Sequence, residues 1–162
     1  MRERQLPQAP AVRPRRVLLV ASAGGHWIQL CRLSPAVEDE DALYVTTLDG
    51  ARTPSGERPV AVVRDASRSD PLSFVQLIAQ LVGIFARFRP EVVITTGAAP
   101  GLMALMLGRI LGARTVWIDS VANCERLSLS GRLAKGWASL RLTQWPEVAE
   151  NTPQLDYYGS VL

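Results

Sequence analysis

The segment VLLVASAGGH, residues 17–26, decides the predicted fold of this 162-residue chain. Its four leading apolar residues are typical of a buried strand in a parallel sheet, and the small residues after them predict a tight turn into a helix beginning near Trp27. Gly24 and Gly25 can adopt positive φ and carry no side chain, so N–H groups at the start of that helix would face open space. Such a turn suits a phosphate group. The alternative is that the glycine pair only turns the chain.

Strands and helices alternate along the rest of the chain, which predicts an α/β fold with an open, mostly parallel, Rossmann-like sheet. Further strands are expected at 42–46, 59–63, 91–95, 114–118 and 142–145, and helices at 27–37, 72–88, 102–111 and 131–140. Asp70 and Pro71 are placed to cap and start the helix 72–88, and Gly112 to end the helix 102–111. Residues 16–162 are expected to form a single domain after a flexible basic tail, residues 1–15.

The net charge of +3 comes from the N-terminal tail rather than from the predicted domain. Residues 1–16 hold five arginines against one glutamate, a balance of +4, so the remaining residues sum to −1. The basic character therefore does not indicate a folded surface for nucleic acid, and no nucleic-acid partner is expected. Such a tail is usually solvated, although anionic lipid headgroups attract basic segments.

Several classes of protein lack their signatures in this sequence. Cys31 and Cys124 form no paired motif, which indicates free thiols in a reducing compartment. The apolar stretch 17–21 is too short for a signal peptide, and no run reaches the roughly 18 uninterrupted apolar residues of a membrane-spanning helix. We therefore expect a chain that is soluble or lies on a membrane face. No metal site is expected, because the single histidine has no second histidine or cysteine cluster beside it.

The segment 72–88 is apolar nearly all round and contains one charged residue. Its polar or small positions form a single narrow stripe, namely Ser73, Gln76, Gln80, Gly83 and Arg87. A helix of this kind is buried in a core, contacts a protein partner, or faces lipid.

The candidate site follows from the ends of the predicted strands. Ligands of open α/β sheets bind beyond the carboxyl ends of the strands, and three such ends carry small or polar residues: 22–26, 96–101 and 119–126. The first two offer backbone N–H groups that suit a diphosphate, and the third offers side chains that suit hydroxyls and charge. The candidate binding residues are Ser22, Gly24, Gly25, Gly97, Ala98, Ala99, Asp119, Ser120, Asn123 and Arg126.

His26 is the only histidine of the chain, and it directly follows the glycine pair. An imidazole changes charge near neutral pH, so it can act as a base or donate a hydrogen bond to a phosphate. The alternative is a packed and hydrogen-bonded side chain without a chemical role. A hydrolase triad and a nucleotide-binding P-loop are not supported, since neither a G-x-S-x-G elbow nor a Walker A motif occurs.

Several motifs resemble one known family and occur in its order. They are SAGGH (22–26), TTGAAPG (95–101), IDSVANCERLSLSGRL (118–133), TQWP (143–146) and YYGSVL (157–162). From about Arg16 to Leu162 the chain resembles the acceptor-binding subunit of split glycosyltransferases. That family includes the membrane-anchoring half of the dolichyl-diphosphate N-acetylglucosaminyltransferase and bacterial proteins of capsule and exopolysaccharide biosynthesis.

The resemblance implies the N-terminal Rossmann-like half of a GT-B glycosyltransferase. This half would hold a polyprenyl-diphosphate-linked sugar, while a partner subunit, the C-terminal GT-B half, would bind the UDP-sugar. Gly24 and Gly25 would lie near the acceptor diphosphate, and His26 would be the candidate catalytic base. The resemblance also implies a cytoplasmic protein, peripheral on the inner face of the plasma membrane, that needs no metal or other cofactor. The family's usual N-terminal spanning segment is not seen, so we expect membrane contact from 72–88, 102–111, the tail or the partner.

Two positions depart from the family pattern and leave the sugar and acceptor specificity open. Asp119 stands where glutamate is frequent, and Asn123 stands where arginine is frequent, with Arg126 as a substitute cation nearby. Three other functions remain open: a non-catalytic enhancer or scaffold that recruits a self-sufficient glycosyltransferase to the membrane, a stand-alone nucleotide-binding protein, and a purely structural domain.

Overall fold

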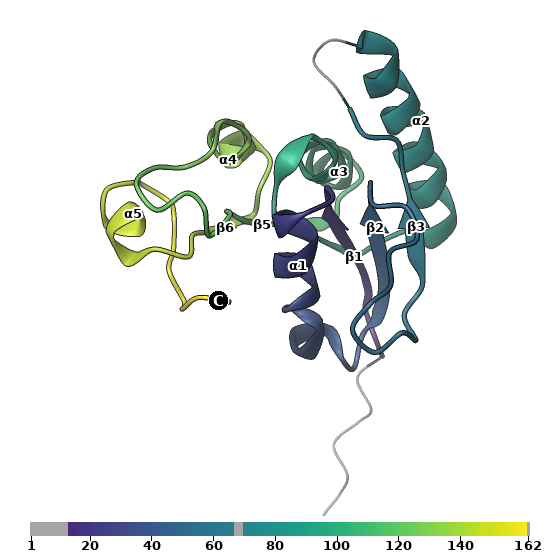
Figure 1. The fold of residues 1–162 in the computed structure, drawn as a ribbon, viewed down its shortest axis with the longest axis horizontal. Coiled ribbons are helices and arrows are strands. Elements are labelled where there is room, and N and C mark those ends of the chain that lie inside the picture. The colour runs from purple at the N-terminus through teal and green to yellow at the C-terminus, as the bar shows by residue number, and fades with distance from the viewer. Residues whose placement is uncertain (1–12, 67–69, 162) are drawn as a thin grey trace, which may run out of the picture.

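The computed structural model describes residues 13–66 and 70–161 and shows one sheet of six parallel strands. The strands are β1 (Arg16–Ala21), β2 (Asp41–Thr46), β3 (Val60–Val62), β4 (Val92–Thr95), β5 (Arg114–Ile118) and β6 (Leu140–Leu142). Their order across the sheet is β3-β2-β1-β4-β5-β6, with β1 and β4 side by side in the middle. In Figure 1, β2 and β3 lie on one side of β1, and β5 and β6 lie on the other. This is the strand order of a Rossmann-like fold, so the expected fold class is confirmed.

Helices cover both faces of the sheet. They are α1 (Gly25–Cys31), α2 (Pro71–Phe88), α3 (Ala98–Ile110), α4 (Leu129–Leu133) and α5 (Pro146–Glu150), with short 3₁₀ helices at Ser34–Val37 and Ala134–Gly136. Successive residues of a strand point to opposite faces, so Leu18 packs in the cluster under α2 and α3, while Leu19 packs with Trp27 and Leu30 of α1. The continuous apolar run of β1 is therefore buried on both sides.

The ends of α2 and α3 have the residues that the sequence predicts for them. Asp70 caps α2, because its carboxylate accepts a hydrogen bond from the Leu72 N–H at 3.1 Å, and Pro71 is the first helical residue. Gly112, two residues beyond the end of α3, has φ of +83°, the left-handed conformation that often terminates a helix.

Three predicted elements differ from the structure. The helix expected at 27–37 ends at Cys31, and a 3₁₀ helix that contains Pro35 follows it. The helix expected at 102–111 begins earlier, at Ala98. The helix expected at 131–140 is wrong beyond Gly136, where the helical residues end. The chain then forms β6, which pairs with β5 and begins at Leu140, two residues before the start of the strand expected at 142–145. The short helix α5 was not predicted.

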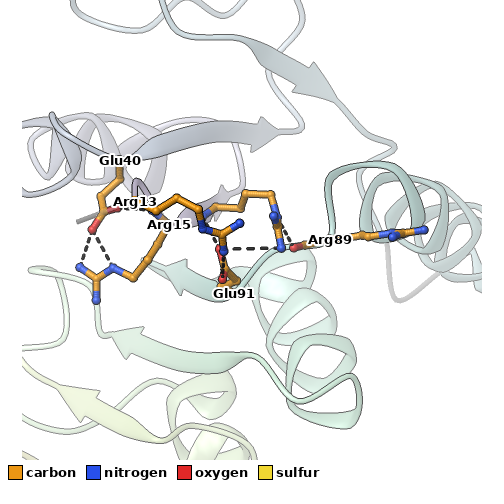
Figure 2. A network of polar contacts seen from close by, with 6 residues as sticks. Arg13, Arg15, Glu40, Arg89 and Glu91 are labelled. Atoms are coloured by element: carbon orange, nitrogen blue, oxygen red, sulfur yellow. Dashed lines mark hydrogen bonds and ion pairs between the residues drawn. The ribbon is translucent and has the colours of Figure 1, made fainter. Parts of the chain in front are cut away.

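Salt bridges hold the start of β1 at the amino edge of the sheet. Arg13 pairs with Glu91 at 2.7 Å, and Arg15 pairs with Glu40 (Figure 2). Most of the tail that we expect to be flexible, residues 1–12, lies outside the described residues. A cavity of about 1020 Å³ lies beside these groups, between the ends of α2 and α3, at the edge opposite the carboxyl ends of the strands.

Candidate functional site

The three loops singled out by sequence lie along one edge of the sheet. Because β1, β4 and β5 are parallel neighbours, their carboxyl ends meet at the same edge. The first two loops touch, because the Thr96 hydroxyl donates to the carbonyl oxygen of His26 at 2.8 Å, and the third loop touches α1, because the Gln29 amide donates to the carbonyl oxygen of Asp119 at 3.1 Å. We call the segments 22–26, 96–99 and 119–126 the rim.

His26 lies between two of these loops. Its Nδ1 is 3.1 Å from the hydroxyl of Ser22, and its ring lies against Gly97, where an added Cβ would be 2.9 Å from the ring Cδ2. Burial lowers the pKa of His26 from its ordinary value, and the negative charge of Asp119 partly opposes this effect. The structure therefore favours a neutral imidazole at neutral pH, as a proton acceptor requires.

The helices that start at the rim carry no side-chain caps. Gly24 is the N-cap of α1 with φ of +76°, Gly97 is the N-cap of α3 with φ of +130°, and neither helix start has a hydrogen bond from a capping side chain. Ala98, in the first turn of α3, adopts φ of +62°, a strained conformation for a residue with a side chain. No atom lies within 4 Å of a Cβ added at Gly24 or Gly25. Exposed backbone of the Gly24–Gly25 turn thus faces open space at the rim, whereas at the start of α3 the Gly97 N–H donates to Thr95 Oγ1 at 3.1 Å and the His26 ring lies against Gly97.

Asp119 holds its own loop together. Its side chain is buried, and its carboxylate accepts hydrogen bonds from Trp117 Nε1, from the hydroxyl and the N–H of Ser128, and from Asn123 Nδ2. The shortest of these, from the Ser128 hydroxyl, is 2.7 Å. With four donors around it, this carboxylate shapes the rim rather than offering a free acceptor to a ligand.

The other candidates of this loop differ in exposure. The Ser120 hydroxyl accepts a hydrogen bond from the Ala122 N–H at 3.3 Å, which stabilises the turn. Arg126 is exposed, and no ion pair joins it to another residue of the described chain. Within residues 13–66 and 70–161, no group of three or more His, Cys, Asp and Glu side chains is placed to hold a metal ion.

Sequence reasoning missed two residues that connect the rim. Gln29 of α1 is buried, donates to the Asp119 carbonyl and accepts from the Val121 N–H at 3.3 Å. Trp145 donates from its indole to the Val121 carbonyl at 2.8 Å. The sequence did contain a sign of each residue. Gln29 is a polar residue between the inward-facing Trp27 and Leu30, and Trp145 belongs to the TQWP motif.

The sheet order and the glycine-containing loops at its carboxyl edge define the chain as a Rossmann-like domain of the kind found in GT-B glycosyltransferases and related epimerases. It is similar in fold to MurG of Acinetobacter baumannii, with a TM-score of 0.70 and 12% identity over 89% of this chain and 45% of that one. It is likewise similar to the UDP-bound structure of MnaA from S. aureus, with a TM-score of 0.68 and 13% identity over 91% of this chain and 44% of that one. The chain thus spans less than half of each of these structures.

The family follows from sequence comparison. The model of the family described as "Oligosaccharide biosynthesis protein Alg14 like" matches residues 57–161, and the chain belongs to that family. Among its relatives is the UDP-N-acetylglucosamine transferase subunit ALG14 of Eremothecium gossypii, 26% identical over 92% of this chain and 81% of the relative. The subunit of the same name from Homo sapiens is 25% identical over 90% of this chain and 82% of the relative.

Both cysteines of the described chain are free thiols, as the sequence predicts.

Proposed function

We propose that the chain is the acceptor-binding subunit of a two-component glycosyltransferase. It forms the N-terminal half of a GT-B enzyme and holds a polyprenyl-diphosphate-linked saccharide, while a partner subunit supplies the UDP-sugar. The reaction extends a lipid-linked saccharide for a cell-surface polysaccharide, such as a capsule or exopolysaccharide. Family membership supports a role in glycosyl transfer, and the relatives are named as subunits of a UDP-N-acetylglucosamine transferase.

The observation that carries this proposal is the meeting of three loops at one edge of the sheet, with the only histidine between two of them. The exposed Gly24–Gly25 turn offers N–H groups to a diphosphate without a competing capping side chain, and the start of α3, which also has no side-chain cap, lies beside it. Arg126 offers a positive charge on the neighbouring loop. His26, with its lowered pKa, lies between the two glycine turns, where a sugar attached to that diphosphate would be held.

In the proposed reaction, the rim positions the acceptor sugar next to the donor held by the partner. The acceptor hydroxyl attacks the anomeric carbon of the UDP-sugar, the bond from that carbon to the UDP oxygen breaks, and UDP leaves with the electron pair. His26 takes the hydroxyl proton as the new bond forms. Because the backbone amides act mainly by orientation, most of the contribution of this chain is positioning.

The test is a transfer assay with the chain and its donor-binding partner purified together. UDP-N-acetylglucosamine, named for the relatives, is the first donor, and a polyprenyl-diphosphate sugar is the acceptor. We expect His26→Ala to lower kcat by about a hundredfold or more, as for loss of a general base. Asp41→Asn is the control, because Asp41 is exposed at the start of β2, on the opposite edge of the sheet. Full activity in His26→Ala would remove this residue from the mechanism.

The same assay separates the other functions. A partner that is active alone and only stimulated by this chain would indicate a non-catalytic enhancer or scaffold. Binding of a UDP-sugar by the isolated chain would instead indicate a stand-alone nucleotide-binding protein. We expect neither result, because the acceptor and donor sites belong to different chains in the proposed enzyme.

We also propose that the outer face of α2 contacts the cytoplasmic surface of the membrane. Among the described residues, α2 is the one helix long and apolar enough to cross a membrane by length and composition. One side of it packs on the sheet through Leu77 and Leu81, while on the other side Leu72 is 69% and Val75 is 63% exposed. In Figure 1, α2 lies on the outer flank of the sheet, beside β3. An apolar face of this kind fits the interface of a bilayer.

Positive charge at the C-terminal end of this face suits an anionic lipid surface, while the first turn of α2 follows the acidic cap Asp70. α2 contains no acidic residue, and arginines surround its C-terminal end and that of α3. These are Arg87, Arg89, Arg109 and Arg114. In vesicle sedimentation with phosphatidylglycerol, we expect Val75→Asp to weaken binding by about tenfold or more, from the lost apolar burial and the added negative charge. Ile28→Asp, an equally apolar and exposed position on α1, is the control, and an equal loss in both variants would contradict the α2 contact.

A further inference from the structure

The two polar contacts of the Ser22 hydroxyl can both be hydrogen bonds in only one arrangement of protons. Ser22 Oγ is 3.1 Å from His26 Nδ1, and it is also 3.4 Å from the carbonyl oxygen of Ala23. A carbonyl oxygen can only accept, and a serine hydroxyl has one proton to donate. Both contacts are therefore satisfied only if the hydroxyl donates to Ala23 and accepts from a protonated Nδ1.

The second nitrogen of the ring is then unprotonated and accessible. No described residue makes a hydrogen bond to His26 Nε2, and no side-chain nitrogen or oxygen of the described residues is both fully buried and without a partner. It follows that Nε2 is not completely buried. A neutral imidazole with a proton on Nδ1 carries its lone pair on Nε2.

Gly97 holds the ring in this place. A Cβ added at Gly97 would lie 2.9 Å from Cδ2 and 3.0 Å from Nε2, so the imidazole edge packs directly on the glycine backbone. The Thr96 hydroxyl donates to the His26 carbonyl oxygen at 2.8 Å and fixes the two loops relative to each other. The ring is thus restrained on one side by Ser22 and on the other by the loop after β4.

We propose that Ser22 is a positioning residue that fixes His26 as the Nδ1-protonated tautomer and leaves the Nε2 lone pair facing the rim. The further step, in which Nε2 takes the proton of the acceptor hydroxyl, rests on the proposed function. In that step the hydroxyl O–H bond breaks, the oxygen bonds to the anomeric carbon, and UDP leaves. The resulting imidazolium keeps its Nδ1–H bonded to Ser22. A fixed tautomer matters because the other one would present an N–H, which cannot accept a proton.

The single histidine makes this proposal directly measurable by NMR. In the full chain with ¹⁵N-labelled histidine, at about pH 8 where the ring is neutral, long-range ¹H–¹⁵N correlation identifies the protonated nitrogen without assignment. We expect Nδ1 to be protonated in the wild type, Ser22→Ala to shift the population towards the Nε2-protonated form, and Ser22→Thr to keep the wild-type state. Ser34→Ala, which removes a hydroxyl bonded to Tyr44 OH at 3.0 Å, is the control with no expected effect. An Nε2-protonated wild type, or an unchanged tautomer in Ser22→Ala, overturns the proposal.

A kinetic measurement with the partner separates this proposal from the proposed function. We expect Ser22→Ala to lower kcat on the order of tenfold, less than His26→Ala, with the KM for the acceptor nearly unchanged and activity restored in Ser22→Thr. A loss confined to KM would show that Ser22 binds the acceptor instead, and would overturn the positioning role in catalysis. If the tautomer shifts as expected but neither variant changes transfer, the base function of His26 fails while the role of Ser22 in fixing the ring stands.

Discussion

Replacement of Asp119 tests whether one buried carboxylate organises the rim. In Asp119→Ala, the indole N–H of Trp117 loses its acceptor in a position that bulk water does not reach, because Trp117 is fully buried. The two donors of Ser128 also lose theirs, although they are only partly buried. Each buried donor left without a partner costs about 1–3 kcal/mol, so we expect a loss of roughly 3–5 kcal/mol in the free energy of unfolding. That is a large part of the stability of a typical domain, about 5–15 kcal/mol.

Asp119→Asn separates the charge from the shape of this side chain. The amide oxygen can still accept from Trp117 and from the Ser128 hydroxyl, but the amide nitrogen would face the Ser128 N–H, which is also a donor. We expect a smaller loss, about 1–2 kcal/mol. Urea denaturation followed by circular dichroism gives both values, with Asp41→Asn as a control within about 0.5 kcal/mol of the wild type. A loss below about 1 kcal/mol in Asp119→Ala would refute the organising role.

The same asparagine variant has a second effect, on the titration of His26. The charge of Asp119 raises the pKa of His26 against the larger effect of burial. Removal of the charge should therefore lower the pKa of His26 further, and an NMR titration of the single histidine measures it. A pKa that rises in Asp119→Asn would show that the carboxylate does not act on the ring through its charge.

Two further predictions concern glycine packing and pH. A Cβ at Gly101 would lie 1.9 Å from Thr95 Oγ1, so Gly101→Ala should destabilise the chain by about 3 kcal/mol. Gly83→Ala, within α2 where a Cβ meets open space, should stabilise it by about 0.5–1 kcal/mol, and thermal melts that fail to separate the two variants would contradict this. Folding lowers the pKa of His26 from 6.5, so the unfolded chain binds the proton more readily, and stability should fall as the pH drops below about 6.5. Urea denaturation across this range should show that loss in the wild type and not in His26→Asn.

The sequence predicted the sheet because β1, β4 and β5 each combine an apolar run with a small-residue or polar loop. Parallel strands bring the loops that follow them to one edge of the sheet, so the position of the rim could be derived from the predicted order of strands and loops along the sequence. The start of α3 was placed too late because Gly97 and Pro100 make the segment around Ala98 look like a loop in the sequence, and Ala98 does have a left-handed φ of +62°. Only the structure shows that the chain enters the helix there.

The roles of the polar residues could not be derived in the same way. Asp119 and Gln29 are both polar residues near a strand end, and composition does not distinguish a side chain that binds a ligand from one that binds its own loop. The segment 137–142 has an apolar pattern that also suits a helix, but it pairs with β5, where the Thr115 hydroxyl donates to the Trp137 carbonyl oxygen at 2.7 Å. Partners distant in sequence decide these cases.

The direction of α2 connects the two proposed contacts of the chain. The connection after β3 leaves the carboxyl edge of the sheet, so α2 starts on the side of the rim, and its most exposed apolar residues, Leu72 and Val75, belong to its first two turns. A diphosphate attached to a polyprenyl chain lies at the membrane surface. If the outer face of α2, including its first turns, rests on that surface, the rim is held where such a diphosphate emerges. Val75→Asp should therefore raise the KM for a long-chain polyprenyl acceptor in vesicles, while the KM for a short-chain, water-soluble acceptor stays the same. Equal changes for both acceptors would show that α2 acts on the rim itself rather than through the membrane.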